Sequence, residues 1–440
     1  MPTVPPQRRH PIATALVLAL AAASPLAAQP AANEPAVVPA AEVEALRAEL
    51  VRLQARLAAL EARAAAAPEP APTPAPAPEP EPAAAAVTGG PGLAVAEDDG
   101  ARGFEIGGRI HFDAYANRDD QVPTTSGTEF RRARFQIEGE AADWGYVLQV
   151  ETSGGIADLR DVYLTRGLGD STLYIGQFKP FRSMEELVSS NDLSTLERGF
   201  GSAAALFDGR QWQQGVGLLT EYAQGTLGVS AFTLREDNTR RNEGWGAAAR
   251  GTWTPLRDGD RLVHLGAWYS LEDGGRNTPA TAVEVAYGGR RGAEALLFES
   301  VAGSAFEQRA AAIEFAGTLG GFHWQGEWTR ATLAGAAGDG RIEASYLQAG
   351  YLFGGVREYD PGEGAFGSPA DVGAGLWEAV ARIDHARLVD APGIEVLRYV
   401  LGVNWYASDD VRFMLNWTVG EDRATGDDPS QLALRAQYVF

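Results

Sequence analysis

Apolar and polar residues alternate along most of the chain from residue 103 to its end, in short segments separated by Gly- and Asp-rich turns. In the segment 411–419, the odd positions hold Val, Phe, Leu, Trp and Val, and the even positions hold Arg, Met, Asn and Thr. Such alternation is typical of β-strands, because successive side chains point to opposite faces of a sheet. The segments number about sixteen, an even number, as single-chain bacterial barrels require. The pattern predicts an all-β fold: a 16-stranded antiparallel transmembrane β-barrel over residues 103–440.

The same alternation occurs in soluble β-sandwiches, whose apolar faces form a core, and in outer-membrane barrels, whose apolar faces contact lipid. Three features favour the barrel: an N-terminal export signal, charged residues on the polar face deep within strands, and aromatic residues near strand ends, where membrane-interface girdles lie. These aromatic residues are Trp144, Trp377, Trp405, Tyr406 and Trp417. We therefore predict a protein of the cell outer membrane of a Gram-negative bacterium.

The last segment alternates up to the final residue. Leu432, Leu434, Ala436, Tyr438 and Phe440 form its apolar series. A strand that runs to the C-terminus can close a barrel and leave no unpaired edge. We expect Phe440 to contribute to insertion and to be read by the barrel-assembly machinery.

The alternation stops between Gly176 and Arg210. Pro180 removes a backbone donor and ends a strand. Two S/T-x-x-E sequences follow, Ser183–Glu186 and Ser194–Glu197, and each predicts the start of a short helical turn. Loops of roughly thirty residues are normally functional. We predict that loop 179–210 follows the fifth strand as the third external loop and folds into the lumen.

The first hundred residues are not globular in composition. Arg8, Arg9 and His10 precede an apolar core and the small residues Leu26-Ala27-Ala28, which predicts a secretory signal peptide. The Arg8-Arg9 pair also raises the twin-arginine export route, although the residues after it fit that route poorly. The predicted segments are a signal peptide at 1–28, a flexible leader at 29–41, a coiled-coil helix at 42–63, and a Pro/Ala-rich linker at 64–102.

The coiled-coil prediction rests on a heptad spacing of three and four residues. It is carried by Val43, Leu46, Leu50, Leu53, Leu57 and Leu60. Three heptads are marginal for a free helix, so we expect other copies of the chain to supply the apolar seam. A lone amphipathic helix lying on the barrel is the alternative. The extension is predicted to lie in the periplasm.

Composition excludes several classes of site and partner. The chain has no Cys, and its net charge of −21 argues against a nucleic-acid partner, which would require a basic face. His111, His264, His323 and His385 are scattered without ligand spacing, so we expect no metal and no cofactor. No nucleophile motif such as G-x-S-x-G occurs. We expect no enzymatic activity; a lipase or protease barrel is the alternative, and hydrolysis of lipid or peptide would reveal it.

Three groups of residues give the chain its resemblance to a known family. They are Glu129-Phe130-Arg131-Arg132-Ala133-Arg134, Gly176-Gln177-Phe178-Lys179 with Met184-Glu185-Glu186-Leu187 and Ser189-Ser190, and Leu401-Gly402-Val403-Asn404-Trp405-Tyr406. In order and spacing they resemble the phosphate-selective porin O and P family. The resemblance implies a trimeric sixteen-stranded porin whose third loop folds inside, and whose inward arginines conduct phosphate or polyphosphate.

The resemblance also implies roles for individual side chains. Arg132 and Arg134 match wall arginines, Asp161 matches a wall carboxylate, and Ser189, Ser190 and Arg198 match the constriction loop. The expected pore-lining set is Arg132, Arg134, Asp161, Lys179, Arg182, Ser189, Ser190 and Arg198. Loop 179–210 departs from the family pattern, because Lys179 is its single lysine and it holds four basic and five acidic residues. We therefore expect weak-to-moderate anion preference and not tight phosphate binding.

Alternatives stay open at this point. Arg132 and Arg134 could pair with Glu138 and Glu140 on the wall, and Glu185 and Glu186 could be helix-start charges favoured by the helix dipole. The expected function is passive diffusion of small anions, including phosphate or polyphosphate, through a water-filled channel. The alternative is a general or weakly selective porin whose coiled coil tethers the outer membrane to a periplasmic layer such as peptidoglycan. The expected partners are a homotrimer, outer-membrane lipid and small anionic solutes.

Overall fold

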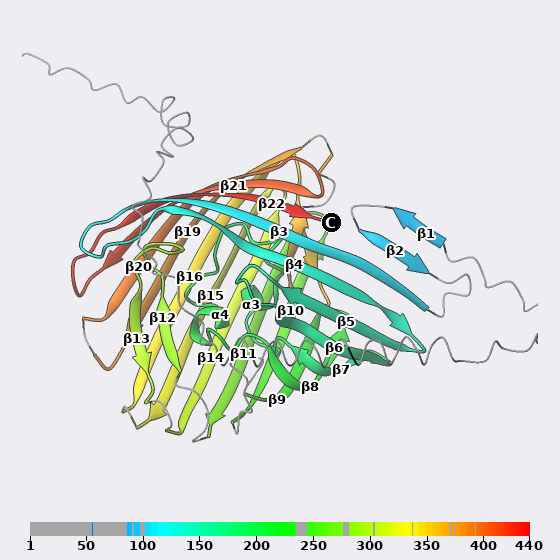
Figure 1. Ribbon diagram of the computed structural model, residues 1–440, viewed down its shortest axis with the longest axis horizontal. Coiled ribbons are helices and arrows are strands. Elements are labelled where there is room, and N and C mark those ends of the chain that lie inside the picture. Colours follow the sequence, from blue (N-terminus) through cyan, green and yellow to red (C-terminus); the bar gives the residue numbers. More distant parts are fainter. Residues whose placement is uncertain are drawn as a thin grey trace, which may run out of the picture. The chain divides into compact units, whose positions relative to one another are not determined.

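The computed structural model describes the barrel and most of its connections (Figure 1). The described residues are 55, 86–89, 92–96, 102–234, 244–275, 281–301, 304–336, 338–369, 372–373, 375–391 and 393–440. The chain divides into two units, Met1–Pro80 and Glu81–Phe440. The predicted signal peptide, leader, coiled-coil helix and first part of the linker lie outside the described residues, apart from residue 55. No helix in the described part of the chain is both long and apolar enough to cross a membrane.

One sheet of eighteen strands forms the second unit, and all of its strands except β1 and β2 make a closed barrel of sixteen. The barrel strands are β3 (Arg102–Arg118), β4 (Gly127–Ala141), β5 (Trp144–Glu151), β6 (Asp158–Leu168), β7 (Ser171–Phe178), β8 (Gln213–Tyr222), β9 (Gly225–Thr233), β10 (Trp245–Asp258), β11 (Arg261–Gly274), β14 (Phe306–Leu319), β15 (Phe322–Gly335), β16 (Gly340–Phe353), β19 (Leu376–Leu388), β20 (Glu395–Tyr406), β21 (Val411–Asp422) and β22 (Ser430–Val439). Each strand pairs antiparallel with the next, and β22 pairs with β3. The predicted closed sixteen-stranded barrel is confirmed.

The two faces of the strands divide as the alternation predicts. On β21 the outward Trp417 is 50% exposed, whereas the inward Asn416 is 4% exposed. On the barrel exterior, Trp377 and Trp405 stack with ring centroids 5.7 Å apart. Tyr406 is a correction: it was predicted in the outer aromatic girdle, but its side chain is buried and its hydroxyl donates to Glu378 at 2.8 Å. A buried tyrosine usually needs such a partner, and the carboxylate lies on the inner wall.

The C-terminus seals the barrel as predicted. The Phe440 N–H donates to the Gly108 carbonyl at 3.0 Å, and the Gly108 N–H donates to the Phe440 carbonyl at 2.7 Å. A Cβ added at Gly108 would lie 2.6 Å from the Phe440 ring, so the close approach of the two strands requires glycine there.

Most connections at one end of the barrel are tight turns, and we call this the turn end. They include 142–143, 169–170, 223–224, 259–260 and 320–321. In the first of these, Ala142 and Asp143 both have positive φ, the backbone that suits a two-residue hairpin. The opposite end carries the longer connections, and we call it the loop end. The connection between β7 and β8 belongs to the loop end and is the third on that side, after 119–126 and 152–157.

The connection between β7 and β8 contains two short helices. In α3 (Met184–Leu187), the Ser183 hydroxyl accepts from the Glu186 N–H, so the first predicted capping sequence does start a helix. The second predicted start is wrong: Ser194–Glu197 is not helical. The polar side chains of this segment bind the barrel wall instead of capping a helix: Ser194 donates to Glu378 at 2.8 Å, and Glu197 accepts from Arg131 at 2.7 Å. The second helix, α4 (Ala203–Leu206), starts at Ser202.

A hairpin lies within the region that the sequence predicts as linker. β1 (Ala86–Gly89) pairs with β2 (Leu93–Ala96), and β2 pairs with the first residues of β3. The cause is the stagger of the closing strands, because β22 pairs with β3 only from Arg109 onward. The start of β3 is thus left with a free edge, and β2 covers it.

Three segments occupy the lumen. The first is the long loop 179–212, and the second is the hairpin of β12 (Ala282–Val285) and β13 (Ala295–Glu299) between β11 and β14. The third is the hairpin of β17 (Arg357–Asp360) and β18 (Ala365–Pro369), which enters between β16 and β19 from the turn end.

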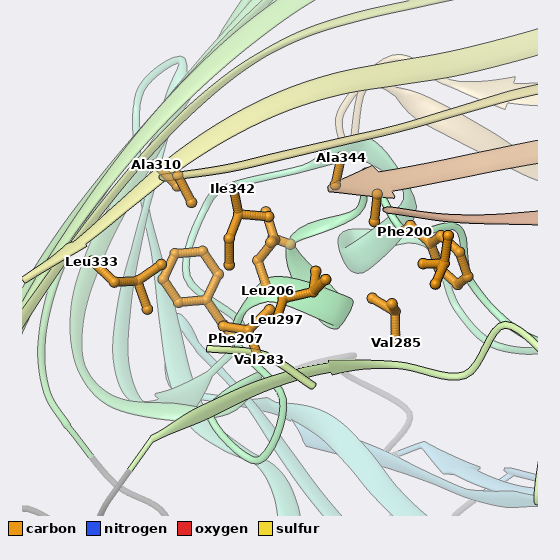
Figure 2. Packing of buried hydrophobic residues seen from close by; sticks show 14 of the residues in the cluster. Phe200, Leu206, Phe207, Val283, Val285, Leu297, Ala310, Leu333, Ile342 and Ala344 are labelled. Carbon is orange, nitrogen blue, oxygen red and sulfur yellow. The ribbon is translucent and has the colours of Figure 1, made fainter. Parts of the chain in front are cut away.

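These segments pack on one another and on the inner wall. Figure 2 shows Phe200, Leu206 and Phe207 of the long loop beside Val283 and Val285 of β12, within one buried cluster. The same cluster includes wall residues of β14, β15 and β16, namely Ala310, Leu333, Ile342 and Ala344. The apolar side of the long loop is therefore buried against the wall, and its polar side is left to line the remaining space.

Candidate functional site

Two chambers lie in the described part of the lumen, and residues of strand β4 line both of them. The larger chamber, about 430 Å³, lies toward the loop end and is lined by Arg131 and Arg132 of β4. The smaller chamber, about 240 Å³, lies toward the turn end and is lined by Gln136 and Glu138 of the same strand. The side chains that line both chambers are Arg134, Lys179, Arg198 and Trp212. These four residues form the boundary between the chambers, and we call them the constriction.

A β-bulge brings two consecutive arginines into the loop-end chamber. The register between β3 and β4 shifts between His111 and Phe112, so that Arg131 has no partner on β3. A bulge places an extra residue on one strand and breaks the alternation locally. As a result Arg131 and Arg132 both line the chamber, while Phe130 beside them is 58% exposed on the outer surface.

Arg132 is buried without a protein counter-charge. Its side chain is 4% exposed, and its Nε and Nη1 atoms have no hydrogen-bond partner among the residues that the structure describes. Arg131 beside it is neutralised by Glu197 at 2.7 Å. A buried guanidinium normally requires an anion or strong acceptors. Arg132 therefore brings to the lining of the chamber a cation that forms no ion pair with a described carboxylate.

Three further cations are held by neutral groups. The Arg198 guanidinium donates to the Glu185 and Val188 carbonyls, both at 2.6 Å. The Lys179 ammonium donates to the Glu186 carbonyl at 2.5 Å, at the C-terminus of α3. Arg109 of β3 donates to the Ser189 and Ser190 hydroxyls at 2.9 and 3.2 Å. Neutral acceptors fix the positions of these side chains, and none of the three forms an ion pair with a described carboxylate.

Arg134 differs from these cations because a wall carboxylate neutralises it. Its Nε atom lies 2.7 Å from Glu151, and its Nη1 atom donates to Gln149 at 3.1 Å. The alternative that Arg132 and Arg134 pair with Glu138 and Glu140 is therefore wrong, since the partner of Arg134 lies on β5. Asp161 lines the turn-end chamber, as do Ser189 and Ser190.

Arg182 has a different place from the rest of the predicted set. Its side chain is fully buried and lines neither chamber. It pairs with Glu272 of β11 at 2.7 Å and with Glu186 at 3.7 Å, so it joins the long loop to the wall. Glu185 also turns to the wall, where it pairs with Arg382, whereas Glu186 lines the loop-end chamber.

Trp212 stands at the centre of the cationic groups. The Cζ atoms of Arg160 and Arg134 lie 4.6 and 5.2 Å from its ring centroid, and the Lys179 Nζ lies at 5.4 Å. Cations are attracted to the face of an indole at such distances. The indole N–H is buried without a partner among the described residues. Trp212 thus stabilises the cluster of basic groups through the face of its ring.

Burial shifts two groups of the long loop toward neutral pH. Burial and the nearby Arg198 guanidinium lower the pKa of Lys179 to about 7. Burial also raises the pKa of Glu186 to about 7, although Arg182 and Lys179 oppose the shift. The two groups change charge in the same range of pH.

Sequence reasoning missed Arg109, Arg160 and Trp212. For Arg109 a signal was present: it has the same parity as His111 and Asp113, whose side chains face inward, and the opposite parity to the exposed Ile110 and Phe112. No comparable signal marked Trp212, because its position depends on how the long loop returns to the wall. Among the described residues, no group of three or more His, Cys, Asp or Glu side chains could hold a metal ion.

Comparison with solved structures shows the same fold. An anion-selective porin from Comamonas acidovorans matches with a TM-score of 0.53 and 11% identity, over 77% of this chain and 100% of that structure. A loop L8 deletion mutant of OmpT, an outer membrane protein of Vibrio cholerae, matches with a TM-score of 0.52 and 12% identity, over 77% of this chain and 100% of that structure. Likeness at such low identity shows the fold alone.

Comparison of sequences shows the family. An uncharacterized protein of Caulobacter vibrioides is 27% identical in an alignment of 356 positions, which covers 72% of this chain and 68% of that protein. The sequence model of phosphate-selective porin O and P matches residues 104–440, which is the barrel from the start of β3 to the last residue. The chain therefore belongs to the phosphate-selective porin O and P family, and its barrel is that of an outer-membrane porin.

Proposed function

We propose that the chain forms a water-filled channel through which small anions diffuse passively, with weak-to-moderate preference for anions over cations. The observation that carries this proposal is a set of four lumen cations without a carboxylate partner among the described residues. They are Arg109, Arg132, Lys179 and Arg198. Each lines one or both chambers.

The local charge of the lumen supports the proposal, in contrast to the charge of the whole chain. The loop-end chamber is lined by nine basic and five acidic side chains, and the turn-end chamber by five basic and three acidic ones. Carboxylates outside the linings pair with several of these arginines, among them Arg290, Arg291 and Arg398, so the support comes from the cations without such a partner and not from the totals. The chain as a whole has a net charge of −21. Charges beyond a Debye length of about 8 Å are screened at physiological salt, so a permeating ion responds mainly to the lining.

The same geometry favours weak attraction over tight phosphate binding. Guanidinium forks and hydroxyls can replace part of an oxyanion's hydration shell in a narrow site. The Ser189 and Ser190 hydroxyls, however, already accept hydrogen bonds from Arg109, and Arg134 already forms an ion pair with Glu151. These groups are therefore only partly available to an oxyanion. A channel also requires that the ion leave as readily as it enters.

The test replaces the constriction and chamber arginines together. In planar bilayers under a salt gradient, the wild-type protein should show a reversal potential of anion-preferring sign. The variant Arg132→Ala/Arg134→Ala/Arg198→Ala should shift it toward cations, because three positive groups leave the lining and Glu151 loses its partner. A triple variant with the wild-type reversal potential would sink the proposed site.

The assembly belongs to the same proposal. The family resemblance and the predicted coiled coil support a homotrimer in outer-membrane lipid, with Phe440 read by the barrel-assembly machinery. A weakly selective porin whose coiled coil tethers the membrane to peptidoglycan is the second candidate. Two results would favour that candidate. The pore would show no preference between anions and cations, and the protein would co-sediment with peptidoglycan unless residues 42–63 are deleted.

A further inference from the structure

We infer that the turn-end chamber accepts small amphipathic carboxylates, aromatic monocarboxylates above all, in preference to inorganic phosphate. The inference rests on the proposed anion channel and names the class of solute for its turn-end half. It follows from two unlike groups of side chains that line one cavity of about 240 Å³: a wall of aromatic rings and a group of cations.

The aromatic wall consists of four side chains in continuous contact. The Tyr174 ring lies 5.4 Å from Tyr163, 5.7 Å from Phe178 and 5.4 Å from Phe181, measured between centroids. Phe178 and Phe181 are buried, and the two tyrosines are half-buried and also line the chamber. Phe181 belongs to the long loop, so these rings also attach that loop to strands β6 and β7. The half-buried tyrosines present ring surface that a solute can contact.

A hydrated inorganic ion gains nothing from such a wall, whereas an aromatic ring does. Aromatic rings in proteins attract one another at centroid distances of about 4.5–7 Å, beyond the effect of the area that they bury. The chamber is large enough for this, since a cavity of about 150 Å³ already binds benzene. The additional volume leaves room for the carboxylate of a single-ring acid.

The basic residues of the chamber offer donors that suit a carboxylate. Arg109 and Arg198 line it and are held by hydroxyls and carbonyls, as described above. The planar fork of arginine matches the geometry of a carboxylate. A ring on the tyrosine side and a carboxylate on the arginine side satisfy both walls at once.

The acidic groups of the chamber favour a singly charged solute. Glu138, Asp161 and Glu363 line it together with five cations. Two of these cations are already neutralised, Arg134 by Glu151 at 2.7 Å and Arg250 by Glu314 at 2.6 Å. The other three cations, Arg109, Lys179 and Arg198, are matched in number by the three carboxylates, so the lining has no large positive excess. A multiply charged phosphate or polyphosphate meets these carboxylates with proportionally greater repulsion than a monoanion does.

The test compares benzoate, cyclohexanecarboxylate, acetate and phosphate on wild-type channels in planar bilayers. Each sodium salt is added to a chloride background, and the block of chloride current gives an apparent affinity. We expect benzoate to bind roughly three- to tenfold more tightly than acetate, with phosphate no better than acetate. Cyclohexanecarboxylate should lie between benzoate and acetate. A channel that only sieves by size would be blocked at least as strongly by cyclohexanecarboxylate as by benzoate, because the two acids are similar in size, and that result would overturn the inference.

Variants separate the two walls. Tyr163→Thr/Tyr174→Thr should reduce the affinity for benzoate to that for acetate. Tyr269→Thr, at an exposed position on β11, is the matched control and should keep the preference for benzoate. A tyrosine variant that keeps the preference for benzoate overturns the inference. If the double variant does not insert, the order of the four wild-type affinities still decides. Loss of anion preference in wild-type chloride recordings would instead refute the proposed channel itself.

Discussion

Two side chains of the long loop make the selectivity of the constriction depend on pH. Burial lowers the pKa of Lys179 and raises the pKa of Glu186, in each case to about 7. Below that range Lys179 becomes charged and Glu186 becomes neutral, so both changes add positive charge to the lumen as the pH falls. We expect the anion preference to rise between about pH 8.5 and about pH 5.5, measured as reversal potential. The variant Lys179→Gln/Glu186→Gln should show a flat profile, and an equally steep profile in that variant would contradict the assignment.

Arg182 contributes to the stability of the long loop but does not line the pore. Its guanidinium pairs with Glu272, which also accepts from Arg210, and it lines neither chamber. Breaking a buried ion pair from one side typically costs about 3 kcal/mol or more. We expect Arg182→Gln to lower the temperature at which the folded barrel loses its heat-modifiable mobility in gels. The reversal potential in chloride should stay unchanged at about pH 5.5, where Glu186 is neutral with or without Arg182. Arg198→Gln is the matched comparison, because Arg198 lines both chambers and should shift the reversal potential. An Arg182 variant that shifts it equally would place Arg182 in the pore.

At the scale of strands, the alternation of apolar and polar residues predicted the number of barrel strands, their outward faces and the closure of the barrel. The outward series on β21 and β22 and the closure at Phe440 follow from period-two patterning. A barrel strand must present apolar side chains to lipid on one face and polar side chains to the lumen on the other. The constriction could be predicted only in part. Arg131 enters the lumen through a bulge, and the pattern of a single strand does not show where its partner shifts register.

The segments inside the lumen were the hardest to predict from sequence. The hairpins β12–β13 and β17–β18 are short, and their burial depends on contacts with the long loop, such as Arg357 of β17 donating to Ser194 at 2.8 Å. That contact joins residues far apart in the chain, as does the pairing of Arg182 with Glu272. Local periodicity carries no information about it. The same contacts drew Ser194 away from the helix start that its sequence predicted.

The last strand gives a test at the scale of one element. The Phe440 ring stacks on Tyr438 with centroids 5.8 Å apart, while its backbone pairs with Gly108. Phe440→Asp keeps the backbone bonds but places a charge at the end of the outward series, which costs up to a few kcal/mol, less near the interface. We expect a strongly reduced amount of heat-modifiable barrel in the outer membrane. Phe440→Tyr keeps an aromatic ring and should insert normally. Wild-type levels of the Asp variant would refute the role of the terminal ring.

At the scale of the whole molecule, we expect different parts of the chain to form the pore and to hold the oligomer together. The barrel closes on itself through β22 and β3, and the residues that line both chambers belong to strands and loops of the barrel, so we expect conduction without the N-terminal extension. The heptad residues from Val43 to Leu60 are predicted instead to strengthen association between chains. Tethered sites gain from a raised effective concentration as long as the linker can span them. A Pro-rich linker reaches about 3 Å per residue and is semi-rigid.

Deleting 42–63 should therefore weaken the oligomer without changing the single-pore conductance or its reversal potential. We expect native mass spectrometry in mild detergent to show trimers for the full-length protein and a larger share of monomers for the deletion variant. The matched control replaces Leu46, Leu50 and Leu57 by Ala, which keeps the length and helix propensity of the segment but removes the apolar seam. It should behave like the deletion. A full-length protein that is entirely monomeric would contradict the predicted assembly. A deletion variant with altered conductance would show that the extension reaches the pore.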